Sequence, residues 1–108
     1  MRSELGLGLR SDRGRLVKGR VVTLSGRLSG AGASAAGAPV SIESIVDGRW
    51  QPVGAARVRA DGRYAWSYRF VHLKRDTIFS FRAVVQRAPG WPWATVRSGP
   101  IKVRVDVP

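Results

Sequence analysis

Apolar and polar residues alternate along most of this chain with a period of two. At 101–107, IKVRVDV, Ile and Val alternate with Lys, Arg and Asp, and TIFSFRAVV at 77–85 repeats the pattern. This is the period of a half-buried β-strand, whose successive side chains point to opposite faces of a sheet. No window of about a dozen residues shows a helical period uninterrupted by Gly or Pro. The pattern therefore predicts an all-β domain, and strands spaced by about 8–14 residues with glycine turns between them favour a sandwich or a barrel.

Two similar turn segments set the expected strand register. VDGRW at 46–50 and ADGRY at 60–64 both place Asp-Gly before Arg and an aromatic residue. If each is a three-residue hairpin loop that ends in a left-handed Gly, Ile45 pairs with Arg49 and Arg59 pairs with Arg63. This register is preferred because a two-residue Asp-Gly turn at 47–48 would separate Val40 and Ile42 from Trp50 onto opposite faces.

The stretch DGRYAWSYRF at 61–70 places an aromatic residue at every second position. Beside arginines, such a row could stack nucleic-acid bases, as the sheet of an RNA-recognition motif does. The predicted register instead turns the row toward small residues of the preceding strand, Gly54 and Ala56, which is the geometry of a packed core. The row is therefore interpreted as core, with Trp66 and Phe81 expected to be fully buried. The row consists of Tyr64, Trp66, Tyr68 and Phe70.

Charge adds a second candidate surface. The net charge is +12, and 16 of the 19 basic residues are Arg. The expected register puts five arginines on one sheet face, where they could bind an anionic partner. The same face could also be a solvated surface of an Arg-rich chain, so both interpretations stay open. The five are Arg49, Arg57, Arg59, Arg63 and Arg69.

The loop at 86–100 contains GWPWA at 90–94, in which Trp91 and Trp93 flank a proline. Exposed Trp pairs bind sugars or proline-rich peptides, which makes this a candidate recognition loop. The alternative is that one Trp plugs the open end of the domain.

The residue types give little support for a catalytic, metal or cofactor site. The chain has one His, His72, seven acidic residues mostly at turns, and no Cys. Nothing in the spacing brings a nucleophile to a base or assembles a metal-ligand set. The prediction is a chain that is not an enzyme, with no cofactor and no metal site.

Several segments taken in order, GRWQPV, ARVRADGRYAWSYRF, FSFRAVV and GWPWA with SGPIKVRV, resemble one kind of module. They are similar to Ig-like or transthyretin-like β-sandwich modules of exported proteins from high-GC Gram-positive bacteria. The resemblance spans residues 17–107 and implies a single-domain Ig-like β-sandwich of about seven antiparallel strands, located outside the membrane. The expected organisation is one domain over 1–108, with an N-terminal strand and linker at 1–16 and the sandwich core at 17–107.

The expected function is a structural or interaction module of an exported or cell-surface protein. It would present the Trp-Pro-Trp loop and the basic face to a protein or a cell-envelope polymer. The chain carries no apolar run of about 20 residues that could span a membrane, and its start lacks the apolar block of a signal peptide. The alternative is a basic domain that binds nucleic acid, through nonspecific charge, or another anionic polymer.

Overall fold

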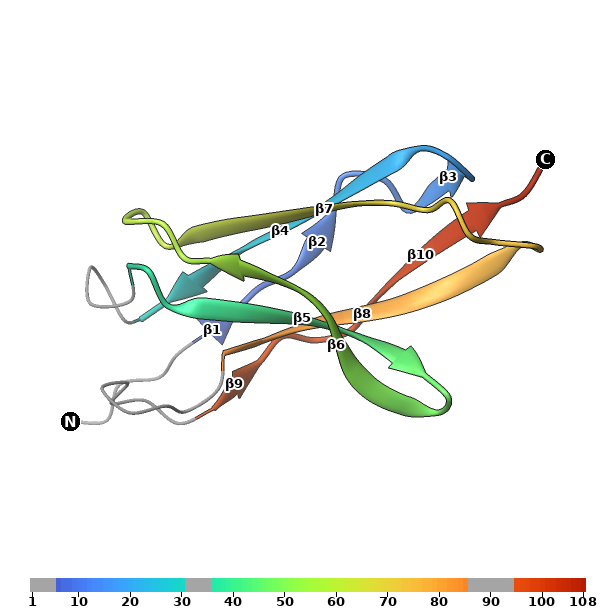
Figure 1. Cartoon of the computed structure of the whole chain (residues 1–108). Coiled ribbons are helices and arrows are strands. Elements are labelled where there is room, and N and C mark those ends of the chain that lie inside the picture. Colours follow the sequence, from blue (N-terminus) through green and yellow to red (C-terminus); the bar gives the residue numbers. More distant parts are fainter. Residues whose placement is uncertain (1–5, 31–35, 86–94) are drawn as a thin grey trace.

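The computed structural model describes residues 6–30, 36–85 and 95–108 (Figure 1). These residues form ten β-strands and no helix, which confirms the all-β prediction; seven of the strands are three residues or longer. The strands are β1 (Gly6–Leu7), β2 (Arg10–Ser11), β3 (Arg15–Val17), β4 (Val21–Ser29), β5 (Pro39–Val46), β6 (Arg49–Arg57), β7 (Arg63–Arg69), β8 (Thr77–Val85), β9 (Val96–Arg97) and β10 (Ile101–Asp106).

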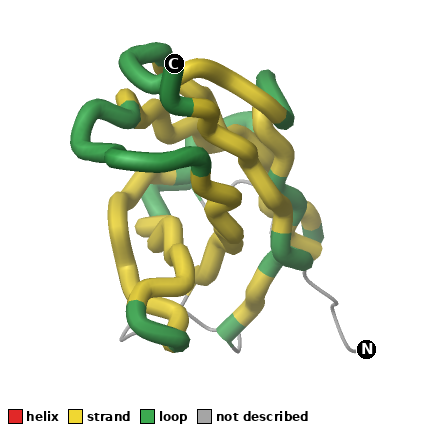
Figure 2. The backbone as a smooth tube through the Cα atoms, turned by 90° about the vertical axis from the view of Figure 1, so that its right-hand side faces the viewer, coloured by secondary structure: helices red, strands yellow, loops and turns green. Residues whose placement is uncertain are grey.

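The strands form two sheets. In the first, β4 is central, with β1 and β2 along one edge and β7 along the other. The second has the order β3-β10-β8-β5-β6, and β9 pairs with the end of β8. Every pairing is antiparallel except β3 with β10. This division of sequential strands between two sheets is that of an Ig-like sandwich, and Figure 2 shows the described chain as strands and loops alone.

The N-terminal segment, expected to be a strand followed by a linker, contributes strands to both sheets. Leu7 and Leu16 from this segment are buried in the core. Asp106 of β10 links β3 to the second sheet by accepting a hydrogen bond from Arg15 Nε at 2.6 Å, and it accepts another from Arg104 Nε of its own strand at 2.8 Å. Both hydrogen bonds lower the pKa of the Asp106 carboxyl, and the bond from Arg104 has the larger effect.

The core lies between the sheets and is built from the inward positions that the alternation marks. Val22 and Leu24 of β4, for example, are completely buried. Phe81 is also buried, as predicted, and so is Tyr64. The Tyr64 hydroxyl donates a hydrogen bond to the Gly8 carbonyl, and burial raises its pKa.

The first predicted hairpin loop is wrong, because the turn has two residues. Val46 pairs with Arg49 and Ile45 with Trp50, and Asp47 and Gly48 both adopt positive φ, 53° and 78°. An Asp-Gly pair suits this type I′ geometry, which matches the twist of the flanking strands.

A β-bulge farther along the same strand pair restores the core parity. The register shifts between Ile42 and Glu43, opposite Pro52, so that Ile42 still pairs with Gly54 as a core position requires. Proline cannot donate a ladder hydrogen bond, and strands accommodate it at bulges. Trp50 consequently lies on the opposite face from Ile42, contrary to the prediction.

The second predicted loop is confirmed in its backbone but differs in its role. Arg59 N–H donates to the Arg63 carbonyl at 2.8 Å, and Gly62 has a φ of 85°. However, β7 pairs with β4 and not with β6. The turn therefore carries the chain from the second sheet to the first, and β6 faces β7 across the sandwich.

Candidate functional site

The aromatic row divides into core residues and residues that are partly open to solvent. Tyr64 and Phe70, at its two ends, are buried, Trp66 is only partly buried, and 42 % of Tyr68 is exposed. The prediction that Trp66 is fully buried was therefore wrong. The physical reason is that β6 belongs to the other sheet, and the β5–β6 hairpin bends away from β7 toward its turn (Figure 1).

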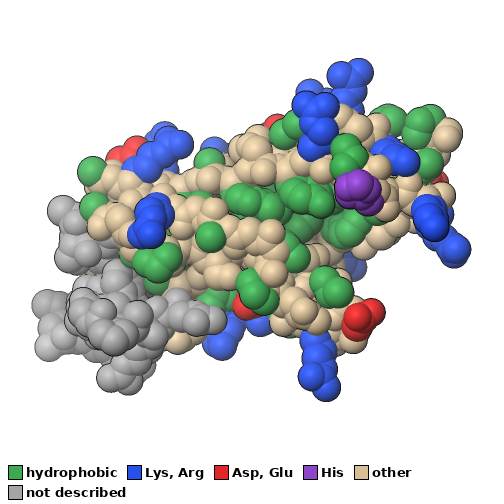
Figure 3. All heavy atoms as spheres, in the orientation of Figure 1, with side chains coloured by type: hydrophobic (Ala, Val, Ile, Leu, Met, Phe, Trp, Pro, Cys, Tyr) green, Lys and Arg blue, Asp and Glu red, His purple; other side chains and the backbone are tan. Residues whose placement is uncertain are grey.

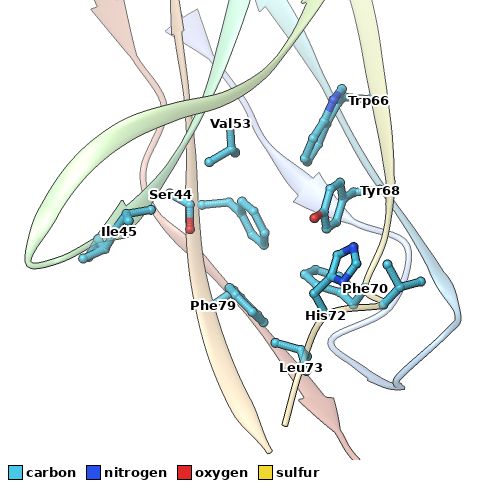
Figure 4. Close-up of a pocket in the computed structure, with 12 residues that line it drawn as sticks. Ser44, Ile45, Val53, Trp66, Tyr68, Phe70, His72, Leu73 and Phe79 are labelled. Atoms are coloured by element: carbon cyan, nitrogen blue, oxygen red, sulfur yellow. The ribbon is translucent and has the colours of Figure 1, made fainter. Parts of the chain in front are cut away.

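Between β7 and the β5–β6 hairpin lies an open, mainly apolar hollow of about 400 Å³, here called the aromatic cleft. Ligand sites typically measure about 300–1,000 Å³. The lining comes from β5, β6, β7, β8 and the segment after β7. It consists of Ser44, Ile45, Val46, Val53, Trp66, Tyr68, Phe70, Val71, His72, Leu73, Phe79 and Phe81 (Figure 4).

Five aromatic rings surround the cleft in a closed sequence of contacts. Trp66 stacks on Tyr68 with ring centroids 5.5 Å apart, and Tyr68 meets the edge of Phe70 at 5.0 Å. Phe79 lies 4.9 Å from Phe70, Phe81 lies 6.1 Å from Phe79, and Trp66 closes the sequence at 6.2 Å from Phe81. Such contacts add to the stability of apolar burial and hold the rings in fixed positions.

The polar groups of the cleft are few. Figure 4 shows Tyr68 and His72 on one side of the cleft, with Ser44 and Phe79 on the other. The Ser44 hydroxyl donates to the Ser80 carbonyl at 2.8 Å, so its proton is already engaged. The cleft is therefore suited to an apolar or aromatic group, with the Tyr68 hydroxyl and His72 as polar partners at its mouth.

Exposed apolar side chains gather at this cleft. Among the described residues, eight large hydrophobic side chains are exposed, and five of them line it, with 40–47 % of each accessible. Figure 3 shows the resulting band of apolar side chains, with Lys and Arg at its margins. The five are Ile45, Val46, Val53, Tyr68 and Val71.

A close contact between the sheets limits the cleft at one end. A Cβ atom built on Gly54 would lie 2.3 Å from both Cε2 and Nε1 of the Trp66 indole. The predicted packing of Gly54 against the aromatic row is thus confirmed, although it occurs across the sandwich. Since only glycine permits this approach, Gly54 fixes how deeply the indole sits.

The predicted five-arginine face does not exist as one surface, because its strands lie in different sheets. Arg49 and Arg57 are on β6, whereas Arg63 and Arg69 are on β7, and Arg59 lies in the turn between them. All five side chains are exposed.

A different arginine cluster lies on the outer face of the first sheet. Arg27 of β4 stands directly opposite Arg63 of β7, and Arg10 of β2 pairs with Ser25, two residues from Arg27. These residues, with Gly8, Leu9 and Gly26, line a shallow hollow of about 450 Å³, here called the arginine groove. Like charges directly opposite on a sheet destabilise it, and a bound anion would relieve this. Sequence reasoning found Arg63 but missed Arg10 and Arg27, which only strand pairing brings together.

Arg82 lies outside both sites and forms an ion pair on the second sheet. Arg82 Nε lies 2.7 Å from Glu43 Oε1, and its guanidinium carbon lies 4.4 Å from the centroid of the Trp50 ring. The Glu43 side chain is largely buried, so this pair and the stacked Trp50 together cover the outer face of β5 and β8.

The Trp91 and Trp93 loop lies outside the described residues. Within residues 6–30, 36–85 and 95–108, no three His, Asp or Glu side chains gather where they could hold a metal ion. The same residues contain no helix long and apolar enough to span a membrane.

Comparisons with known proteins identify the fold and no family. No protein-family model matches the chain, and no curated protein matches it in sequence. Matches exist among solved structures, in 65 chains, so the fold is a common one and does not by itself define an activity. One is the CARDB domain of a Pyrococcus furiosus protein, determined in complex with di-metal ions. The TM-score is 0.54 at 7 % identity, over 97 % of this chain and 94 % of that one, which shows that the two share the sandwich fold.

Proposed function

We propose that this chain is a non-enzymatic interaction module that binds a partner protein through the aromatic cleft. The observation that carries the proposal is the concentration of exposed apolar side chains there, five of eight among the described residues. Contiguous apolar surface on a folded domain marks interaction sites, because exposing it to water is otherwise unfavourable. The rigid ring of five aromatics supplies the kind of anchor pocket that dominates interface energetics.

The chemistry of the lining supports a binding role in preference to a catalytic one. Ser44 and His72 both line the cleft, so they are its nearest counterparts of a nucleophile and a base. Ser44 is buried and directs its proton to the Ser80 carbonyl, not to an imidazole. A serine held this way has no base to activate it.

The setting we propose is an exported or cell-surface protein of which this module is one part. This rests on the resemblance of residues 17–107 to modules of exported proteins. The Trp91 and Trp93 loop is proposed as an additional contact for the same partner.

Binding of side-chain analogues tests the cleft. Titration of isotope-labelled protein with p-cresol and indole, which model Tyr and Trp side chains, should give saturable NMR shifts at Tyr68 and His72. Val53→Arg should abolish these shifts by placing a charge in the cleft, whereas Ile78→Arg should preserve them, since Ile78 is 59 % exposed and does not line the cleft. Shifts that do not saturate, or equal effects of both variants, would refute the proposal.

A second candidate function, binding of an anionic polymer, is favoured by the arginine groove. Its cross-strand Arg27 and Arg63 give the domain a local concentration of positive charge with a defined shape. Heparin retention that persists above physiological salt, and that Arg27→Ala with Arg63→Ala lowers more than Arg49→Ala with Arg57→Ala, would support it. Equal losses for the two double variants would leave only the general charge of the chain as the cause.

A further inference from the structure

Within the described residues, strand β7 has a free edge beside the aromatic cleft. On one side it pairs with β4 without interruption, from Arg63 with Arg27 to Arg69 with Val21. No other strand of the described residues pairs with it. Constant-type Ig domains carry a fourth strand at this edge of the corresponding sheet.

The edge of β7 lacks the protection that β6, at the edge of the other sheet, possesses. β6 contains Pro52, which cannot donate a ladder hydrogen bond, and a bulge that interrupts its register. Proteins use such features to prevent unwanted pairing at sheet edges. β7 has no Pro, Gly or bulge over its seven residues, and its only charges are Arg63 and Arg69 at its ends.

The backbone groups at this edge point outward in a predictable pattern. The N–H of Arg63 donates to Asp61 Oδ1 at 3.0 Å, and its carbonyl accepts from Arg59 N–H at 2.8 Å, so both groups face away from β4. Backbone direction alternates along a paired strand. Ala65 and Ser67 therefore also turn their N–H and carbonyl groups to the free edge, and both residues are exposed.

We propose that an extended segment of a partner protein adds to β7 as a further strand, hydrogen-bonded to Ala65 and Ser67. This deepens the proposed function and rests on it, because every second side chain of the added strand would enter the aromatic cleft beside Trp66 and Tyr68. The intervening side chains would lie on the outer face. Main-chain bonds then give affinity and the cleft gives specificity, as in other cases of strand addition.

The outer face defines the chemistry of that segment. Arg63 and Arg69 flank the free edge, and Arg27 stands beside Arg63. Asp61 reaches Arg63 only at 4.0 Å, and Arg69 bonds the Gly19 carbonyl at 3.3 Å, so neither guanidinium is fully satisfied within the domain. Acidic residues at the outward positions would complement them. The partner segment is therefore one in which apolar and acidic residues alternate.

A second copy of this chain is a poorer occupant. Antiparallel pairing of two β7 edges would bring Arg63 of one copy toward Arg69 of the other. Like charges opposite one another destabilise a sheet, and each copy carries a net charge of +12. The charge pattern thus favours an acidic partner over self-association.

A peptide selection tests the proposal. The full chain is screened against displayed peptides of about nine residues, a typical strand length, in which apolar residues alternate with Asp, Glu, Ser or Thr. One matched library shuffles the same residues, and another carries Lys in place of the acids. The alternating acidic peptides should be enriched over both, and calorimetry on the best of them gives the reference affinity.

Two changes to the backbone then separate strand addition from side-chain docking. Ala65→Pro removes one outward N–H at an edge position that tolerates proline, and Ala65→Ser retains it as the matched control. Methylating the peptide nitrogens that face β7 removes bonds without altering the protein. Ala65→Pro and the methylated peptide should each bind about tenfold more weakly or worse, while Ala65→Ser binds like the parent.

Unchanged affinity of the methylated peptide, or equal enrichment of the shuffled peptides, would overturn strand addition. A dimer of the free chain that Ala65→Pro abolishes would overturn the acidic partner and make a second copy the occupant of the edge. Other measurements test binding in the aromatic cleft independently of strand addition. Peptides that lose binding with Val53→Arg but not on methylation would retain the proposed function without strand addition. Failure of p-cresol and indole to bind would instead remove the proposed function.

Discussion

Gly54→Ala places a methyl group where the Trp66 indole now lies. The new Cβ would be 2.3 Å from Cε2 and Nε1 and 2.6 Å from Cζ2 of that ring. Ordinary contacts are about 3.5–4.0 Å, so the indole has to withdraw by more than an ångström. The aromatic cleft lies beside the ring, and we expect the indole to move into it.

Two opposing effects set the size of the change in the free energy of unfolding. Overpacking of a well-packed site costs about 1–3 kcal/mol, whereas replacing a strand glycine by alanine returns about 0.5–1 kcal/mol. We expect a net loss of about 1–2 kcal/mol in the free energy of unfolding. For a domain of this size, 1 kcal/mol corresponds to a fall of about 4–8 °C in Tm.

A double-mutant cycle identifies Trp66 as the cause. Trp66→Leu removes the ring atoms that the new methyl group would meet, so Gly54→Ala made in that background should be neutral or slightly stabilising. Urea unfolding followed by circular dichroism gives all four free energies, with a coupling of about 1–3 kcal/mol expected. Gly14→Ala is the control, since nothing lies within 4 Å of the added Cβ there.

Two results would refute this reasoning. One is a Gly54→Ala protein as stable as the parent, which would mean that the sheets are farther apart than the close contact requires. The other is an equal cost of Gly54→Ala with and without Trp66. Binding of p-cresol offers a second measurement, because an indole displaced into the cleft should weaken it.

Three further predictions concern the polar contacts of the fold. Tyr64→Phe leaves the Gly8 carbonyl without its buried donor and should cost about 1–2 kcal/mol in urea unfolding; an unchanged midpoint would contradict the contact. Arg82→Ala leaves the largely buried carboxylate of Glu43 without its ion-pair partner and should lower the free energy of unfolding by about 1–3 kcal/mol. Adding Glu43→Gln to this variant should recover part of the loss, whereas two independent substitutions would not compensate each other. The pKa of Asp106 is lowered in the folded state, so its contribution to stability is present above the unfolded-state value and is lost as pH falls below about 4. The Tm of Asp106→Asn should therefore depend less on pH between about 4 and 2 than the Tm of the parent. If the two proteins lose Tm equally as pH falls, the Asp106 carboxylate does not stabilise the fold in this way.

Alternation was sufficient to predict the strands because it reflects which face of a strand is buried. It could not predict which strands share a sheet. The turn at 59–63 has the backbone of a tight loop, as the sequence predicts, yet it joins β6 and β7 of different sheets. Its local geometry is compatible with either outcome, and packing of the whole core decides between them. The five-arginine face was wrong for this reason, and also because the two-residue turn places Arg49 and Arg57 on opposite faces of β6.

The hairpin at 46–49 shows a second limit, in which two local irregularities compensate. The three-residue loop was preferred because it made the core parity consistent, and the core parity was right for Val40, Ile42 and Gly54. The structure reaches the same parity with a two-residue turn and a bulge. Pro52 was the available signal, because a proline inside a strand favours a bulge or an edge. Between the turn and the bulge, Trp50 changes face, and so do its neighbours Arg49 and Gln51.

The candidate sites depend on these same features. A row of alternating aromatics predicts an apolar face, but it does not say what covers that face. In this chain β6 covers Trp66 only as far as Gly54, and beyond the bulge the hairpin bends away and leaves Tyr68 exposed. The bulge that protects the edge of β6 thus also accompanies the opening of the cleft next to the unprotected edge of β7. An apolar face, a free strand edge and incompletely paired arginines meet along one strand among the described residues, and this coincidence, more than any single residue type, is why we propose β7 as a binding edge.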